Sequence, residues 1–140
     1  MKTRSITKKE VIPVHYLIDA KGKNYGKLVV MVSKLLLGKN KVNFVRYIPI
    51  IDKVTIKNAK LVDVTPTRLT KAYHWHSMFP GGIKEGSFEL LREKNPDKLY
   101  RISLQGMLPK NRLGRRMLEA ITIFPDERVP ELDYKVIDNI

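Results

Sequence analysis

Four cationic side chains crowd one short stretch of the chain, with no acidic residue among them. Lys110, Arg112, Arg115 and Arg116 fall within seven positions. On a helix the three arginines share a face, because they are spaced at i, i+3 and i+4. Like charges at this spacing cost roughly 0.2–0.5 kcal/mol per pair in an isolated helix. Phosphates relieve that repulsion and accept paired hydrogen bonds from guanidinium groups, so the stretch predicts a phosphate-binding surface.

A solvated helix face is the alternative interpretation of this stretch, but such faces usually carry both signs of charge. Gly114 lies among the arginines and lowers the stability of a helix by roughly 1 kcal/mol relative to alanine. Because it has no side chain, it permits another backbone to approach closely. We therefore expect a close backbone approach at Gly114.

The segment GKNYGK, from Gly22 to Lys27, is similar to a nucleotide-binding P-loop but does not fit its pattern. A P-loop has four residues between its glycines, and a Ser or Thr after its lysine reaches magnesium. Here three residues separate Gly22 from Gly26, and Leu28 follows Lys27. A P-loop-like NTPase is therefore kept only as the last of the alternative functions. We expect Lys23, Lys27 and the start of the following helix to hold an RNA phosphate, and a tight turn without a ligand is the alternative.

Two further lysines follow Gly38, the glycine expected to end that helix. A lysine near a helix C-terminus interacts favourably with the helix dipole, which explains one of the two. The presence of both Lys39 and Lys41 in so basic a chain predicts contact with an anion.

His74 and His76 alternate within the segment YHWHSMFPGG, so on a strand they would share a face and could contribute to a metal site. A first coordination shell needs more ligands, and neither a cysteine nor a nearby carboxylate supplies them. We therefore predict no metal site.

Tyr73, Trp75 and Phe79 interleave with these histidines. Aromatic rings beside basic residues favour RNA binding, because unstacked bases stack on them. The alternative is that the rings cover a sheet, which accounts for about half of them. Gly81 and Gly82 predict a turn that also brings the backbone close to a partner.

No arrangement of side chains predicts an enzyme. The serines lack a recognisable histidine and aspartate partner, and a nuclease would need clustered acids for metal-assisted hydrolysis. The acidic residues instead concentrate between Glu119 and Asp138. We therefore predict no catalytic residue, cofactor or small-molecule substrate.

Composition points to one compact domain that binds a polyanion. The chain has 140 residues, 27 of them Lys or Arg against 14 Asp or Glu, for a net charge of +13. It has no cysteine, and no apolar run approaches the length of a membrane span. Its basic first residues lead into no apolar region of a signal peptide. We expect an intracellular soluble protein with no membrane partner.

Periodicity and capping signals predict the elements that position these side chains. We expect strands over 14–20, 53–62 and 120–124, and helices over 25–37, 88–94, 96–106 and 111–119, with Ser87 and Asn95 as N-caps. Residues 62–76 are expected to form a loop with short extended pieces. The alternation favours an α/β domain with a mainly parallel sheet. We divide it into a basic arm (1–13), an α/β body (14–124) and an acidic extended tail (125–140).

Several segments resemble one known family. HYLIDAKGKNYGKL, LLLGKNK, SMFPGGIKEGSFELL and above all GMLPKNRLGRRML look like the bacterial-type large-subunit ribosomal proteins of the L-thirteen family, in bacteria or organelles. The matches run in order from about residue 15 to 124. Segments 46–53, 65–71 and 125–134 depart from the family's pattern, and no contact is carried over there.

The resemblance implies a three-layer α/β/α domain with a small, mainly parallel sheet. It also implies a non-catalytic role on large-subunit ribosomal RNA, beside neighbouring ribosomal proteins and early in assembly. A cytoplasmic ribosome is expected, or an organellar one, and a regulatory RNA binder off the ribosome is the alternative. The expected RNA-binding side chains are Lys23, Lys27, Lys39, Lys41, His76, Lys84, Lys110, Asn111, Arg112, Arg115 and Arg116. Close backbone approach is expected at Gly22, Gly26, Gly38, Gly81, Gly82 and Gly114.

Overall fold

The computed structural model describes residues 7, 12–46 and 52–137. Its main sheet has four parallel strands in the order β5-β2-β1-β6. They are β1 (His15–Asp19), β2 (Lys53–Lys57), β5 (Ile121–Ile123) and β6 (Lys135–Ile137). A second, antiparallel sheet pairs β3 (Ala72–His76) with β4 (Ile83–Ser87). The predicted α/β domain with a mainly parallel sheet is confirmed.

The helices begin and end close to the predicted positions. They are α1 (Tyr25–Leu37), α2 (Pro66–Leu69), α3 (Phe88–Lys94), α4 (Pro96–Met107) and α5 (Arg112–Glu119), and Ala59–Leu61 forms a short 3-10 turn, η2. Gly38 ends α1 at a φ of 73°, and Ser87 caps α3 by accepting a hydrogen bond from the Leu90 N–H. Asn95 precedes Pro96 as predicted, but its side chain makes no capping hydrogen bond.

Three predictions about secondary structure were wrong. The strand expected over 53–62 ends at Lys57, and η2 follows it. The region 62–76, expected to be a loop with short extended pieces, contains the strand β3 as an extended piece but also the short helix α2, which was not predicted. The strand at 120–124 is not the last one, because β6 follows it and pairs with β1 at the sheet's edge. A strand of three residues in an acidic segment has too weak a pattern to be found without its neighbour.

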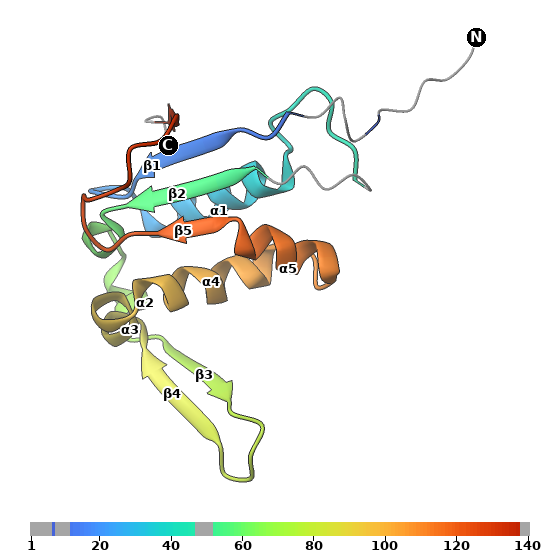
Figure 1. Ribbon diagram of the computed structural model, residues 1–140. Coiled ribbons are helices and arrows are strands. Elements are labelled where there is room, and N and C mark those ends of the chain that lie inside the picture. Colours follow the sequence, from blue (N-terminus) through green and yellow to red (C-terminus); the bar gives the residue numbers. More distant parts are fainter. Residues whose placement is uncertain (1–6, 8–11, 47–51, 138–140) are drawn as a thin grey trace.

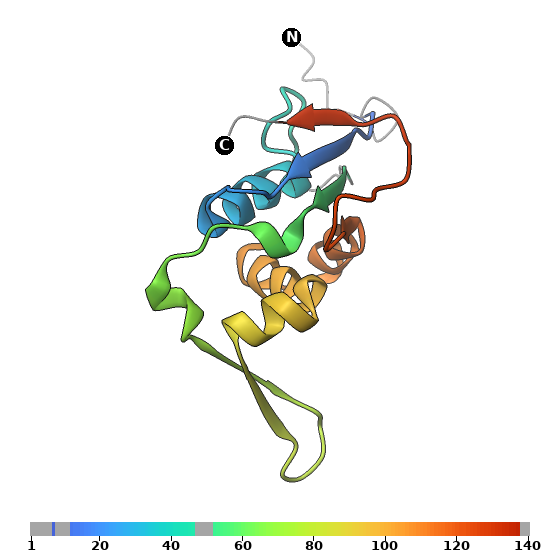
Figure 2. The same cartoon turned by 90° about the vertical axis from the view of Figure 1, so that its left-hand side faces the viewer.

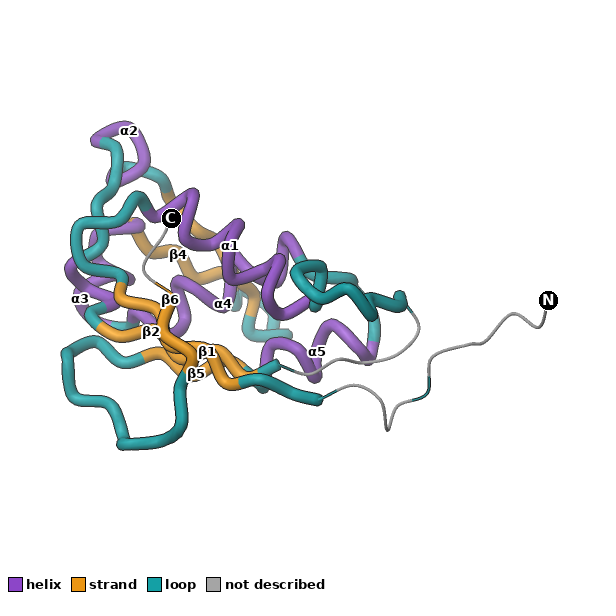
Figure 3. Tube along the Cα trace, turned by 90° about the horizontal axis from the view of Figure 1, so that it is seen from above, coloured by secondary structure: helices purple, strands orange, loops and turns teal. Residues whose placement is uncertain are grey.

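Right-handed connections decide which face of the sheet each segment covers. The steps from β1 to β2 and from β2 to β5 move in the same direction across the sheet, so their helices lie on one face. The step from β5 back to β6 reverses direction and passes over the other face. Figure 3 shows this layering, with α1, α4 and α5 together on one side of the strands.

The core lies between the sheet and these helices. Ile18, Val54, Ile56 and Ile121 point from the strands into it, while α1, α3 and α4 add buried leucines and aromatic rings. Tyr25 of α1 stands edge-on to the Phe88 ring, with centroids 4.9 Å apart. Burial raises the pKa of Tyr25, whose hydroxyl donates a hydrogen bond to Ser103 Oγ at 2.7 Å.

The acidic connection between β5 and β6 covers the second face. Its backbone accepts hydrogen bonds from the N–H groups of Asn58 and Ala59, and its last ring, Tyr134, lies edge-on to His15 with centroids 4.5 Å apart. Figure 2 shows β6 running beside β1 after this connection. The predicted tail is therefore part of the sheet at residues 135–137.

The hairpin of β3 and β4 projects away from the body (Figure 1). The predicted basic arm lies mostly outside the described residues, as do residues 138–140 of the tail. None of the helices in the described ranges is long and apolar enough to cross a membrane.

Candidate nucleic-acid interface

The loop before α5 is built around Asn111 and Gly114. Asn111 caps α5, because its side-chain oxygen accepts a hydrogen bond from the Gly114 N–H at 2.9 Å. Gly114 is buried, and a Cβ atom there would overlap the carbonyl oxygen of Pro109. The close backbone approach predicted at Gly114 is therefore made by the chain itself, which folds the Pro109 carbonyl onto the first turn of α5.

The arginines of α5 face solvent while its apolar side docks on the body. Met117 is buried and Leu113 half-buried, so Arg112, Arg115 and Arg116 are left exposed on the outer side. None of these three arginines forms an ion pair with another described residue. The helix presents its cations to whatever lies outside the chain.

A second basic segment lies beside this loop, although the two are far apart in the sequence. Lys39, Arg46 and Asn111 line one groove of about 510 Å³ between the loop after α1 and the start of α5. We call the cations gathered here the basic end of the molecule. They are Lys39, Arg46, Lys110, Arg112, Arg115 and Arg116. Figure 1 shows both segments at the right of the view.

Arg46 was missed by the sequence reasoning. It lies in segment 46–53, where the family's pattern is lost, and its local sequence carries a single charge. Only the groove that it shares with Asn111 reveals it as part of the basic end.

Lys41 is held inside the chain. Its ammonium lies 2.6 Å from a carboxylate oxygen of Asp52 and also donates to the Ile12 carbonyl at 2.8 Å. Asp52 is fully buried. We therefore leave Lys41 out of the candidate interface, because its charge neutralises a buried carboxylate.

The Gly22–Lys27 segment lies at the opposite, carboxyl end of the strands. Its Asn24 side chain accepts hydrogen bonds from the N–H groups of Gly26 and Lys27, at 3.0 and 3.4 Å. Two of the donors that a phosphate would use are therefore already paired. The ammonium of Lys23 is enclosed, without a hydrogen-bond partner among the described residues, whereas Lys27 is exposed.

A groove along α1 runs from Lys27 towards the basic end. This groove, of about 610 Å³, follows the outer side of the helix and is lined by Lys27, Lys34 and Asn40. Lys34 was another residue missed by the sequence reasoning, since in isolation it marks only the polar side of a mostly buried helix. The two lysines share a face at a spacing of i and i+7.

His74 and His76 do share one face of β3, as their alternation predicted. The pairing of β3 with β4 places Glu85 opposite His74, 3.6 Å from its Nδ1, so the prediction that no carboxylate lies nearby was wrong. His76 Nδ1 instead accepts a hydrogen bond from the Met78 N–H at 3.0 Å. In the described part of the chain no group of three or more His, Cys, Asp or Glu side chains could hold a metal.

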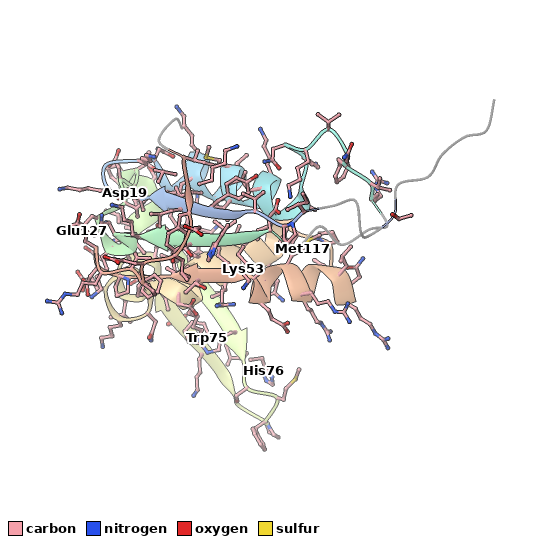
Figure 4. All side chains as sticks on the ribbon, turned by 45° about the horizontal axis from the view of Figure 1, so that its top comes forward. Asp19, Lys53, Trp75, His76, Met117 and Glu127 are labelled. Carbon is pink, nitrogen blue, oxygen red and sulfur yellow. The ribbon has the colours of Figure 1, made fainter. Side chains whose placement is uncertain are left out.

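The aromatic residues of the hairpin divide between packing and exposure. Tyr73 and Trp75 turn towards the body, and the Lys98 ammonium of α4 lies 3.4 Å from the centre of the Trp75 ring. Phe79 at the tip is 73% exposed, beside the exposed Met78. Figure 4 shows Trp75 close to the body and His76 nearer the tip.

The turn of the hairpin requires its glycines for the chain's own geometry. Gly81 has a φ of 70°, and a Cβ atom at Gly82 would overlap the Ser77 hydroxyl. The exposed Lys84 follows on β4. The hairpin thus presents a cation and an apolar tip at a distance from the basic end.

The end of the sheet opposite the basic end carries charges of both signs, because Lys21, Lys57 and Lys60 lie at or just after the ends of the strands there. Asp19 and Glu127 lie at the carboxyl end of the strands, opposite the exposed nitrogen-tipped side chains of α5 (Figure 4).

Comparison with known proteins identifies the group to which this arrangement belongs. Residues 14–130 match the model of the family described as ribosomal protein L13. The chain belongs to the ribosomal protein L13 family. The large ribosomal subunit protein uL13 of a Nitratiruptor species is 40% identical over 128 residues, which is 91% of this chain and 92% of that protein. The uL13 of Aquifex aeolicus is 38% identical over 136 residues, 96% and 94% of the two chains.

The L13 match includes the basic end, the α1 groove and the hairpin. L13 proteins are ribosomal proteins and not enzymes, which agrees with the two defects of the Gly22–Lys27 segment as a P-loop. The predicted family is therefore confirmed.

Proposed function

We propose that this chain is a constituent of the large ribosomal subunit that binds large-subunit ribosomal RNA and supports early assembly of the subunit and translation. The observation that carries the proposal is the exposed arginine face of α5, which has no ion-pair partner among the described residues. The large-subunit names of the relatives supply the second argument.

The folded body holds the cations at fixed positions. Asn111 and Gly114 fix the loop, and Met117 anchors α5, so Arg112 and Arg115 reach an RNA backbone without first becoming ordered. Preorganisation of this kind lowers the entropic cost of binding. Recognition then depends mainly on RNA shape and phosphates, with few contacts to base edges.

The hairpin acts as an arm that reaches a second RNA segment. Lys84 and His76 supply polar contacts, and Phe79 offers a ring on which an unstacked base stacks. An apolar tip this exposed is expected to be covered in the assembled particle, by RNA or by a neighbouring ribosomal protein. The proposed role requires no cofactor, metal, membrane or small-molecule substrate, and it places the protein in a cytoplasmic or organellar ribosome.

Charge reversal at the basic end tests the proposal. The double variant Arg112→Glu with Arg115→Glu should fold but fail to enter large-subunit particles on a sucrose gradient. Arg128→Glu with Lys135→Glu is the matched control, because it changes the net charge equally at exposed positions outside the basic end. The control should enter the particles normally.

Two outcomes of the gradient contradict the proposal. Normal entry of the Arg112→Glu, Arg115→Glu variant would remove α5 from the binding surface. A wild-type pool that stays outside the subunit fractions, crosslinked to other RNA, would favour a regulatory RNA binder off the ribosome.

A further inference from the structure

A cavity of about 400 Å³ opens beside the arginine face, between the end of α4 and the start of α5. Gln105 and Gly106 of α4, Lys110 and Asn111 of the loop, and Arg115 of α5 supply its polar lining. Ile102, Leu108 and Leu118 are among the apolar residues that line it. The volume is within the range of small-molecule sites, and polar groups surround an apolar part, as such sites require.

Gly106 is the unusual residue of this cavity. It lies in the last turn of α4 without a positive φ, and a Cβ atom there would meet nothing within 4 Å. Gly114, by contrast, is required by the Pro109 carbonyl. A helical glycine is less favourable than alanine by up to about 1 kcal/mol. Neither backbone strain nor crowding within the described chain explains Gly106, which points to a partner that lies against it.

The lining suits a planar group attached to a phosphate. Asn111 Oδ1 is occupied by the Gly114 N–H, so the amide nitrogen of Asn111 remains as a donor, and Gln105 offers both a donor and an acceptor. The Arg115 guanidinium can stack on a base or pair with a phosphate. Lys110 and Arg115 also belong to the arginine-rich surface proposed to hold the RNA backbone.

We propose that this cavity takes one unstacked nucleotide of the ribosomal RNA. The base enters between α4 and α5 and lies against the backbone of Gly106, while its phosphate meets Lys110 and Arg115. Gln105 and Asn111 read the edge of the base. This inference rests on the proposed function, and it adds a base-specific contact to a surface otherwise expected to bind phosphates.

The variant Gly106→Leu fills the cavity without altering charge. Because the position is open and helical, the melting temperature should stay at or above the wild-type value. The purified full-length protein is bound to a large-subunit rRNA transcript, and both base-modifying reagents and hydroxyl radicals are used as probes. Wild-type protein should protect the Watson–Crick edge of one unpaired base within its footprint.

In Gly106→Leu that base should become reactive again while the backbone footprint persists, and affinity should fall about 5- to 150-fold, as expected for losing one bound base. Gly106→Ala, which adds one methyl group, should lie between the two. Unchanged affinity and protection in Gly106→Leu would overturn the proposal, as would a wild-type footprint with no protected unpaired base. If Arg112→Glu with Arg115→Glu still abolishes binding in either case, the proposed function stands. If that variant binds like wild type, the proposed RNA surface is wrong as well.

Discussion

Arg101 of α4 holds the end of α5 in place through the backbone carbonyl of Leu118, to which its guanidinium donates at 2.7 Å. The same group donates to the Ile121 carbonyl at 3.2 Å and to Asp97 at 2.8 Å. Arg101 therefore joins α4, α5 and β5. In the sequence it counts as one more cation of the basic run, but in the fold its hydrogen bonds are all internal.

Replacing Arg101 should weaken the fold more than the binding surface. Arg101→Met keeps much of the side chain's bulk but leaves the carbonyls of Leu118 and Ile121 without this donor. Hydrogen bonds to charged groups contribute about 1.5–3 kcal/mol, so we expect a loss of that order in the free energy of unfolding, measured in urea. Arg116→Met, which removes an exposed cation, should leave stability within about 0.5 kcal/mol. Equal stabilities of the two variants would contradict this role of Arg101.

Two glycines of the same region should respond in opposite directions to alanine. Gly114→Ala forces a methyl group against the Pro109 carbonyl and should cost about 1–3 kcal/mol of stability, as overpacking does. Gly106→Ala adds its methyl group in open space and should stabilise the helix by up to about 1 kcal/mol. Thermal unfolding of both variants tests this, and destabilisation by Gly106→Ala would show that the position is not open.

We expect Lys39 to contribute to RNA binding and Lys41 to contribute to the stability of the fold. Lys39→Ala should lower rRNA affinity and reduce the salt slope of binding by about one phosphate contact, with the fold unchanged. Lys41→Ala leaves the buried Asp52 carboxylate without its cation, which costs about 3–5 kcal/mol.

Asp52→Asn in the Lys41→Ala background should recover part of that stability, because the buried charge is then removed. The salt slope of the folded Lys41→Ala protein should equal the wild-type slope. A salt slope reduced as in Lys39→Ala would place Lys41 on the RNA after all.

Of the aromatic rings on the hairpin, we expect Phe79 to contribute to RNA binding and Trp75 to contribute to stability. Phe79→Ala, at an exposed position, should leave thermal stability unchanged and weaken rRNA binding by about 1–3 kcal/mol, the contribution of one stacked base. Trp75→Ala removes the ring that packs on Gly86 and lies under the Lys98 ammonium, so it should lower stability. Unfolding curves and filter binding at one salt concentration distinguish the two, and an unaffected affinity in Phe79→Ala would rule out stacking at the tip.

Asp19 should make the free energy of unfolding depend on pH in the acidic range. Burial by itself raises its pKa, but hydrogen bonds from the Asn58 side chain and the Lys21 N–H, together with the Lys57 ammonium, outweigh burial and lower the pKa below the ordinary 3.8. The carboxylate therefore stabilises the fold at neutral pH, and this stabilisation is lost as the pH falls below 3.8 through the lowered folded-state pKa.

The Asp19→Asn variant should accordingly be less stable than wild type at about pH 7, and the difference should shrink towards about pH 2. Denaturant titrations at a series of pH values measure it. A difference that does not change with pH would mean that the carboxylate charge contributes nothing.

Much of the local structure followed from the sequence because its causes are local. The apolar stripe of α1, its end at Gly38 and the capping of α3 by Ser87 each depend on residues within a few positions. The arginine spacing of α5 likewise fixed which side chains share a face, and the net charge of +13 indicated a polyanion before any contact was known.

Tertiary structure decided which cations are presented to a partner. Lys41, Lys23 and Arg101 look like Lys39 and Arg112 in the sequence, but ion pairing, enclosure or internal hydrogen bonds hold the first three within the chain. These internal contacts join residues that are far apart in the sequence and are brought together by the sheet order and the right-handed connections. No local sequence pattern encodes such contacts. The sequence by itself determined the charge, the family and the helices α1, α3, α4 and α5. Three features depend on the packing of distant segments on one sheet. They are the groove lined by both Arg46 and Asn111, the cavity at Gly106 and the pairing of β6 with β1.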